Sequence, residues 1–173
     1  DGTVTSLGVQ VGFGTSASPL RLFTWTPDGT RLLFPDPSGN LTYVRISDKA
    51  VTPLRLQGTD PVFHPSGSFF VFVGAVNNTP QLFVANADGS NLRPLNLQGS
   101  HPILSPDGQF LLFASGSGST AQAFVQQLDS TGNPVGAPIA LNLTPFVEGV
   151  FASWSPDSQK IAMSVSGGQF GGQ

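Results

Sequence analysis

Trp25-Thr26-Pro27-Asp28-Gly29 is the first of four copies of one short phrase in this chain of 173 residues. The other three copies are Phe63-His64-Pro65-Ser66-Gly67, Leu104-Ser105-Pro106-Asp107-Gly108 and Trp154-Ser155-Pro156-Asp157-Ser158. Each copy is followed by a run with the apolar content of a buried strand: Arg31 to Phe34, Phe69 to Val73, Phe110 to Ala114 and Lys160 to Val165. The prolines of successive copies lie 38, 41 and 50 residues apart. A strand-rich repeat with a period of about 40 residues predicts an all-β fold, a β-propeller built of four-stranded blades.

The residues of the phrase predict a tight turn between two strands. Proline fixes φ near about −65°, aspartate accepts hydrogen bonds from the local backbone, and glycine tolerates positive φ. The residues assigned to these turns are Pro27, Asp28, Gly29, Pro65, Gly67, Pro106, Asp107, Gly108, Pro156 and Asp157. Ser158 replaces the glycine, so the fourth copy is less suited to the turn. The large apolar residue two positions before each proline is expected to pack between blades: Trp25, Phe63, Leu104 and Trp154.

Four short strands are expected in each repeat. In the second repeat they are Asp60 to His64, Phe69 to Gly74, Gln81 to Asn86 and Asn91 to Leu97, with a loop from Ala75 to Pro80. In the first they are Leu20 to Trp25, Arg31 to Phe34, Leu41 to Ile46 and Thr52 to Leu56. In the third they are His101 to Ser105, Phe110 to Ser115, Gln122 to Leu128 and Ile139 to Leu143. The longer period of the third repeat is assigned to a projecting loop, Asp129 to Pro138.

The repeats fill the whole chain, so a single domain is expected over residues 1–173, with units at approximately 20–59, 60–100, 101–149, and 150–173 together with 1–10. Val4 to Val9 follows an Asp-Gly pair as Asn91 to Leu97 does, and is predicted to form the fourth strand of a blade. These matches predict three complete blades and a partial one. A segment of a larger propeller is favoured over a closed four-bladed ring, in which a missing strand would leave a slot for another chain.

The composition argues against several classes of partner and site. Only 10% of the residues are charged, the net charge is −3, and the seven basic residues are scattered. Nucleic-acid binding needs clustered Lys and Arg, so no nucleic-acid partner is expected. The absence of cysteine excludes disulfides and thiolate zinc sites. The run Phe69 to Val73 is too short to cross a bilayer, and no transmembrane segment is expected.

The phrase and the strands after it resemble the WD40-like, or PD40, repeats of the TolB type. The family phrase is Trp-Ser-Pro-Asp-Gly followed by an Ile-Ala-Phe-like strand, and Trp154-Ser155-Pro156-Asp157 with Lys160-Ile161-Ala162-Met163 is the nearest copy. Leu82-Phe83-Val84-Ala85-Asn86-Ala87-Asp88-Gly89 matches the second half of the family repeat. The resemblance covers essentially the entire chain and is specific for fold.

The resemblance implies a periplasmic or extracellular bacterial protein whose propeller binds other proteins. Similar propellers also occur as accessory domains of prolyl-oligopeptidase-like serine peptidases. This chain has no Gly-x-Ser-x-Gly elbow, the feature that carries the nucleophile of such hydrolases. We therefore expect no enzyme activity, no catalytic residues and no cofactor.

Three residues are candidates for a shared site at the mouth of the propeller channel. His101 and Asp60 each lie five residues before the proline of their phrase, on first strands that should lie nearest the axis, and Glu148 is the third candidate. A carboxylate–imidazole group there could bind a basic peptide end or a metal, but the loose spacing assigns no metal site. His64 is expected to bond the turn backbone, and 36–40, which superficially resembles a calcium loop, is interpreted as a plain hairpin turn.

The function expected from these observations is a non-catalytic protein-interaction or structural module. Recognition is assigned to loops at one end of the frame, mainly Asp129 to Pro138, Ala75 to Pro80 and Ser115 to Ala121. Low charge predicts binding with weak salt dependence. Two alternatives stay open: an accessory propeller of a larger serine peptidase, and a subunit of an extracellular or membrane-associated assembly completed by a strand from a neighbour.

Overall fold

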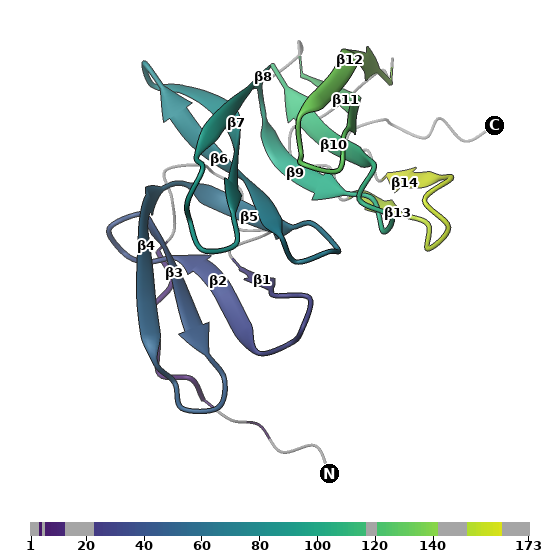
Figure 1. The fold of residues 1–173 in the computed structure, drawn as a ribbon. Helices are drawn as coiled ribbons and strands as arrows, with labels where there is room; N and C mark the ends of the chain where they lie inside the picture. The colour runs from purple at the N-terminus through teal and green to yellow at the C-terminus, as the bar shows by residue number, and fades with distance from the viewer. Residues whose placement is uncertain (1–3, 5, 13–22, 117–120, 142–151, 164–173) are drawn as a thin grey trace, which may run out of the picture.

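The chain folds into separate antiparallel β-sheets arranged side by side as blades (Figure 1), in a computed structural model that describes residues 4, 6–12, 23–116, 121–141 and 152–163. Three sheets have four strands in simple sequential order, and the fourth has two described strands. This arrangement confirms the predicted all-β propeller with three complete blades and a partial one.

The blades take their strands in the following order. Blade 1 contains β1 (Thr24–Trp25), β2 (Arg31–Pro35), β3 (Asn40–Arg45) and β4 (Val51–Gln57). Blade 2 contains β5 (Thr59–Phe63), β6 (Phe69–Val76), β7 (Thr79–Asn86) and β8 (Arg93–Gln98). Blade 3 contains β9 (Ser100–Leu104), β10 (Phe110–Ser115), β11 (Gln122–Leu128) and β12 (Pro134–Ala140), and blade 4 contains β13 (Ala152–Trp154) and β14 (Ile161–Met163). The first strands lie nearest the common centre, where β5 contacts both β1 and β9 (Figure 1).

The core lies between the blades, because each sheet buries apolar side chains on both faces. Blades 1 and 2 share a cluster that includes Leu33, Tyr43 and Phe70. Blades 2 and 3 share a larger cluster that includes Val71 and Phe113. The strongly apolar strand β6 therefore supplies alternate residues to the two interfaces, which explains its continuous hydrophobic sequence.

Three segments of the strand prediction are wrong. The predicted loop from Ala75 to Pro80 is a hairpin, since β6 runs to Val76, β7 starts at Thr79, and Asn77 and Asn78 form the turn with φ of 50° and 62°. Half of the predicted projecting loop Asp129 to Pro138 belongs to strand β12, and the other half is the tight turn that precedes it. Residues 4 and 6–9 form no strand, so the fourth strand predicted at Val4 to Val9 is not formed in that part of the chain.

The proline-centred turns form as predicted and also connect neighbouring blades. Thr26 Oγ donates to Asp28 Oδ1 at 2.5 Å, and these turn hydrogen bonds lower the pKa of Asp28 to about 2. Ser66 N donates to His64 Nδ1 at 3.1 Å, so His64 bonds the turn backbone as expected. Ser158 adopts φ of 60°, lies buried, and accepts from Asp107 N at 3.1 Å across the blade boundary. The serine therefore fits the turn and adds an interblade hydrogen bond.

The aromatic position of the phrase packs on the preceding blade in three repeats out of four. Phe63 and Leu104 are buried, and Trp154 Nε1 donates to Ile103 O of blade 3 at 3.2 Å. Trp25 is 50% exposed, so its predicted packing between blades is wrong in the described structure. Among the described residues, no blade covers the face of blade 1 that carries Trp25.

Candidate functional site

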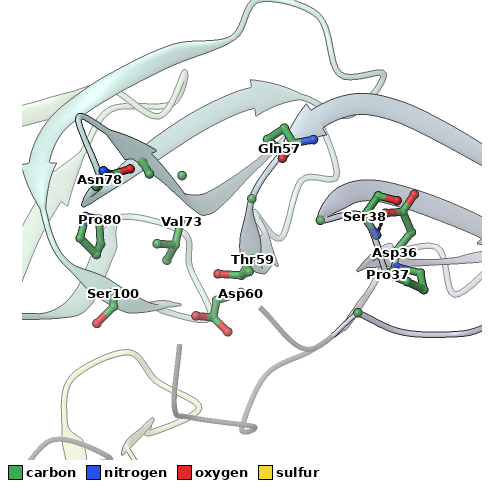
Figure 2. Close-up of a pocket in the computed structure, with 15 residues that line it drawn as sticks. Asp36, Pro37, Ser38, Gln57, Thr59, Asp60, Val73, Asn78, Pro80 and Ser100 are labelled. Carbon is green, nitrogen blue, oxygen red and sulfur yellow. Dashed lines mark hydrogen bonds between the residues drawn. The ribbon is translucent and has the colours of Figure 1, made fainter. Parts of the chain in front are cut away.

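A cleft of about 670 Å³ opens between blades 1 and 2, at the end of the propeller opposite the proline-centred turns. Figure 2 shows its lining side chains, which come from the turn after β2, the end of β4, the start of β5, the β6–β7 hairpin and the start of β9. The lining residues are Gly12, Asp36, Pro37, Ser38, Gly39, Gln57, Gly58, Thr59, Asp60, Val73, Gly74, Ala75, Asn78, Pro80 and Ser100.

A bulge in the innermost strand of blade 2 sets the position of Asp60. Thr59 pairs with Val73, but the next pair is Val62 with Val71, so an extra residue is accommodated in β5. Asp60 lies in this bulge with φ of 50°, a conformation that costs a non-glycine residue roughly 1–2 kcal/mol. Only 6% of the residue is exposed, and its carboxylate lies at the inner edge of the cleft (Figure 2).

The same bulge recurs in blade 3 and positions His101. Ser100 pairs with Ala114 and Ile103 with Leu112, which leaves His101 in the bulge with φ of 55°. The Oγ of Ser100 and Nδ1 of His101 lie 2.9 Å apart, and Ser100 itself lines the cleft. The spacing from the proline predicts that Asp60 and His101 occupy the same position of the repeat, and in the structure both lie in the bulge of a first strand.

The imidazole of His101 nevertheless does not face the cleft that Asp60 lines. His101 lines a separate small gap between blades 3 and 4, with apolar neighbours that include Leu112, Ala152 and Met163. Its Nε2 is buried without a hydrogen-bond partner in the described part of the chain. Glu148 lies outside the described residues, so the structure describes two of the three predicted site residues and puts them on adjacent first strands.

The opposite wall of the cleft contains a charged residue that the sequence interpretation treated only as part of a turn. Asp36 Oδ1 accepts from Ser38 N at 2.8 Å and from Asn40 N at 3.0 Å, which confirms the plain turn predicted for 36–40. Asp36 itself also lines the cleft. Gln57 Nε2 donates to Asn40 Oδ1 at 3.0 Å and links this turn to the end of β4.

Two of the glycines that line the cleft pack their backbone against aromatic rings. A Cβ atom at Gly58 would overlap the Phe72 ring and approach Val73 O to 2.7 Å. A Cβ atom at Gly74 would lie 2.8 Å from the Phe83 ring. Both positions therefore require glycine, because a side chain there would collide with the aromatic ring against which the backbone packs.

The described charged residues of the cleft all have the same sign. Among the described residues of the lining, the charged ones are Asp36 and Asp60, and both are acidic. The remaining polar side chains of the lining are hydroxyl and amide groups: Ser38, Gln57, Thr59, Asn78 and Ser100. The residues that the structure describes contain no group of three or more His, Asp or Glu that could hold a metal ion. The described lining therefore combines two acidic residues with several hydrogen-bonding side chains.

The three loops assigned to one recognition surface lie at two ends of the propeller. The β6–β7 hairpin borders the cleft through Asn78. The β11–β12 turn lies at the other end, where Arg93 at the start of β8 donates to Asn133 Oδ1 at 3.0 Å and to Thr131 O. This corrects the expectation that the Asp129 to Pro138 segment shares an end with Ala75 to Pro80. Most of Ser115 to Ala121, namely 117–120, lies outside the described residues.

The fold is similar to solved β-propellers of low sequence identity. TolB from Acinetobacter baumannii is 20% identical, with a TM-score of 0.67 over 88% of this chain and 40% of the TolB chain. A chain of a nidogen/laminin complex is 12% identical, with a TM-score of 0.63 over 83% of this chain and 55% of that one. Hydrazine synthase from Kuenenia stuttgartiensis is 19% identical, with a TM-score of 0.62 over 91% of this chain and 44% of that one.

These similarities show a β-propeller fold, and the chain spans about half the length of these structures or less. No protein-family model and no curated protein matches the sequence. Within the described ranges, no helix is long and apolar enough to cross a membrane.

Proposed function

We propose that this propeller is a non-catalytic module that binds a segment of another protein in the cleft between blades 1 and 2. The observation that carries the proposal is the cleft itself, whose volume of about 670 Å³ falls in the range of pockets that enclose a ligand. Most of its lining comes from the ends of packed strands in blades 1 and 2, with Ser100 from blade 3, so binding requires little ordering of these residues.

The lining suits a peptide better than an apolar small molecule. Hydroxyl and amide side chains line the cleft together with Gly58 and Gly74, and no aromatic residue is among the described residues of the lining. Such a surface recognises its ligand through hydrogen bonds, and each peptide group of a bound segment offers both a donor and an acceptor. A similar propeller occurs in the nidogen/laminin complex, which fits a role in binding protein.

The proposed location is the bacterial periplasm or the extracellular space. It rests on the resemblance of the repeat phrase to TolB-type repeats and on the similarity of the fold to TolB. Low overall charge and scattered basic residues agree with a protein partner rather than a nucleic acid.

A second candidate is an accessory propeller in an enzyme, and the similarity to hydrazine synthase favours it. In that case the same cleft would serve a catalytic domain or subunit. Sequencing the gene on both sides of this region separates the two candidates, since an adjoining hydrolase or redox domain would support the second one.

Site-specific photocrosslinking tests the first candidate. Benzoylphenylalanine replaces exposed Ser38, which lines the cleft, or exposed Thr131, which occupies the equivalent place in the Asp129 turn at the other end. Irradiation in an envelope extract of the source organism should give a discrete protein adduct from position 38 and not from position 131. Equal adducts from both positions, or none from position 38, would refute binding in the cleft.

A further inference from the structure

We infer that the junction between blades 2 and 3 contains a pH-sensitive contact, in which protonation of His64 loosens its own turn and moves the adjoining turn of blade 3. This contact lies at the end of the propeller opposite the cleft, so the inference goes beyond the proposed function and does not depend on it. Its starting point is an exchange of residues in the repeat phrase, where His64 and Ser66 replace the hydroxyl residue and the aspartate of the other copies.

The other three copies of the phrase are held by a hydroxyl–carboxylate pair. The hydroxyl groups of Thr26, Ser105 and Ser155 each donate to the aspartate two residues later, at 2.5 or 2.6 Å. These hydrogen bonds lower the pKa of all three aspartates, to about 2 for Asp28. The three carboxylates therefore stay charged at physiological pH, and their turns keep one protonation state.

In the blade 2 turn, an imidazole nitrogen accepts a hydrogen bond where the other copies use a hydroxyl donor. His64 Nδ1 accepts from Ser66 N at 3.1 Å and lies 2.7 Å from Ser66 Oγ. Ser66 Oγ lies 2.6 Å from Ser68 Oγ, which continues the network along the turn. A protonated imidazole carries N–H groups at both nitrogens and accepts no hydrogen bond. Protonation therefore breaks the hydrogen bond from Ser66 N and displaces the ring from its place in the turn.

The His64 ring is packed against blade 3, so its displacement reaches that blade. A Cβ atom at Gly108, in the β9–β10 turn, would overlap His64 Nε2, and the ring forms a hydrogen bond with the Gly108 backbone. The ring also stacks on Phe69, with the two centroids 4.4 Å apart. A Cβ atom at Gly132, in the turn before β12, would lie 2.8 Å from the Phe69 ring. Two turns of blade 3 thus contact either His64 or the ring on which it stacks.

The groups around His64 favour its neutral form in the folded protein. Burial lowers the pKa of His64 below its ordinary 6.5, against the opposing effects of the Gly108 hydrogen bond and the Asp107 charge. Asp107 in the β9–β10 turn is the charged group that acts on the ring among the described residues. Strand β6 contributes the uncharged Phe69, and the turn itself contributes uncharged serines. The contact should therefore be complete above pH 6.5 and change as the pH falls through the lowered pKa.

NMR spectroscopy of the whole chain between about pH 8 and about pH 5 tests the inference. We expect the His64 ring to titrate with a midpoint below 6.5, and the nuclear Overhauser effect between this ring and Gly108 Hα to be lost with the same midpoint. The effect between the Phe69 ring and Gly132 Hα should weaken in parallel. Both signals report distance, so a change of charge without movement leaves them constant. Titration of His64 with constant signals would overturn the inference.

Two variants assign the movement to His64. His64→Thr combined with Ser66→Asp transfers the hydroxyl–carboxylate pair of the other copies to blade 2, and the signal between the Phe69 ring and Gly132 Hα should then be independent of pH over this range. His101→Asn removes the other histidine, at a position with φ of 55° that asparagine tolerates, and should leave the pH dependence unchanged. A pH dependence that persists in the first variant, or disappears in the second, would assign the movement to another group and overturn the inference.

Discussion

Replacing Phe63 by alanine should destabilise the protein far more than replacing Trp25, although the two residues occupy the same place in the repeat phrase. Phe63 is 8% exposed, and its ring centroid lies 5.5 Å from that of Phe70 and 6.3 Å from that of Tyr43. Truncation of a buried phenylalanine costs about 3–5 kcal/mol, because transfer energy is lost and a cavity remains between blades 1 and 2. That cost is a large fraction of the roughly 5–15 kcal/mol that stabilises a typical domain.

Trp25 is 50% exposed, so Trp25→Ala removes the packing contacts of only the buried half of the residue. Water can fill the space that remains. Full burial of a large apolar side chain contributes about 1.5–3 kcal/mol, which makes the expected cost about 1–1.5 kcal/mol. Val51→Ala, at a strand position that is 55% exposed, serves as a control that should change stability by less than about 0.5 kcal/mol.

Urea unfolding followed by far-ultraviolet circular dichroism measures the three variants on one scale. A loss of at least about 2 kcal/mol more for Phe63→Ala than for Trp25→Ala would support the blade packing described here. Equal losses would refute it, since Trp25 would then be buried against another body in solution. Repeating the measurement at several protein concentrations would show whether that body is a second copy of the chain.

Three further predictions concern the proline-centred turns and can be checked by the same unfolding assay. Ser158→Ala should lower stability by about 1–2 kcal/mol, because it removes the hydroxyl that accepts from Asp107 N while the residue keeps its φ of 60°. Ser158→Gly should be about 1 kcal/mol more stable than Ser158→Ala, because glycine adopts positive φ without strain. Equal stability of the two variants would exclude backbone strain at this residue. Burial lowers the pKa of His64 below its ordinary 6.5 against the opposing effect of the hydrogen bond to the Gly108 backbone, so the neutral form is favoured in the folded state. The contribution of His64 to stability should be complete above pH 6.5 and should be lost as the pH falls through the lowered pKa. His64→Gln should therefore flatten the dependence of unfolding free energy on pH in this range. An unchanged dependence would contradict the lowered pKa of His64. Hydrogen bonds from Thr26 and Thr30 lower the pKa of Asp28 from 3.8 to about 2. The contribution of Asp28 to stability should therefore be complete above pH 3.8 and should decline as the pH falls towards 2. Asp28→Asn should show a shallower decline over this range, and an equally steep decline would contradict the prediction.

Local turn chemistry made much of the fold predictable. The predicted strands Phe110 to Ser115 and Gln122 to Leu128 coincide with β10 and β11, because a proline-centred turn begins the pair and apolar alternation continues through it. The fourth strand of this repeat was predicted at Ile139 to Leu143, and the first part of β12 was missed because Pro134-Val135-Gly136-Ala137-Pro138 has the composition of a loop. An outer strand accepts proline, and Gly136 with φ of 70° lies where the register between β11 and β12 shifts.

The candidate site was only partly predictable, for a different physical reason. Spacing from the proline was enough to put Asp60 and His101 in equivalent places, because the bulge belongs to the repeat. Asp36 was missed because its local sequence explains its carboxylate fully as a turn acceptor. Its position across the cleft from Asp60 arises from the packing of two blades, and no local pattern in the chain encodes that packing.

The two ends of the propeller differ in how their polar groups are used, and this difference predicts how substitutions act. At the end with the proline-centred turns, polar groups are bonded within turns or across blade boundaries, as in Tyr43 Oη to Ala87 O at 2.7 Å and Arg93 to Asn133. Substitutions there should change the free energy of unfolding and leave ligand affinity unaltered. At the other end, Asp36 accepts hydrogen bonds within its own turn and also lines an open cleft. Asp36→Asn keeps the turn and should change affinity with little change in stability, so one pair of measurements on each variant separates the two roles.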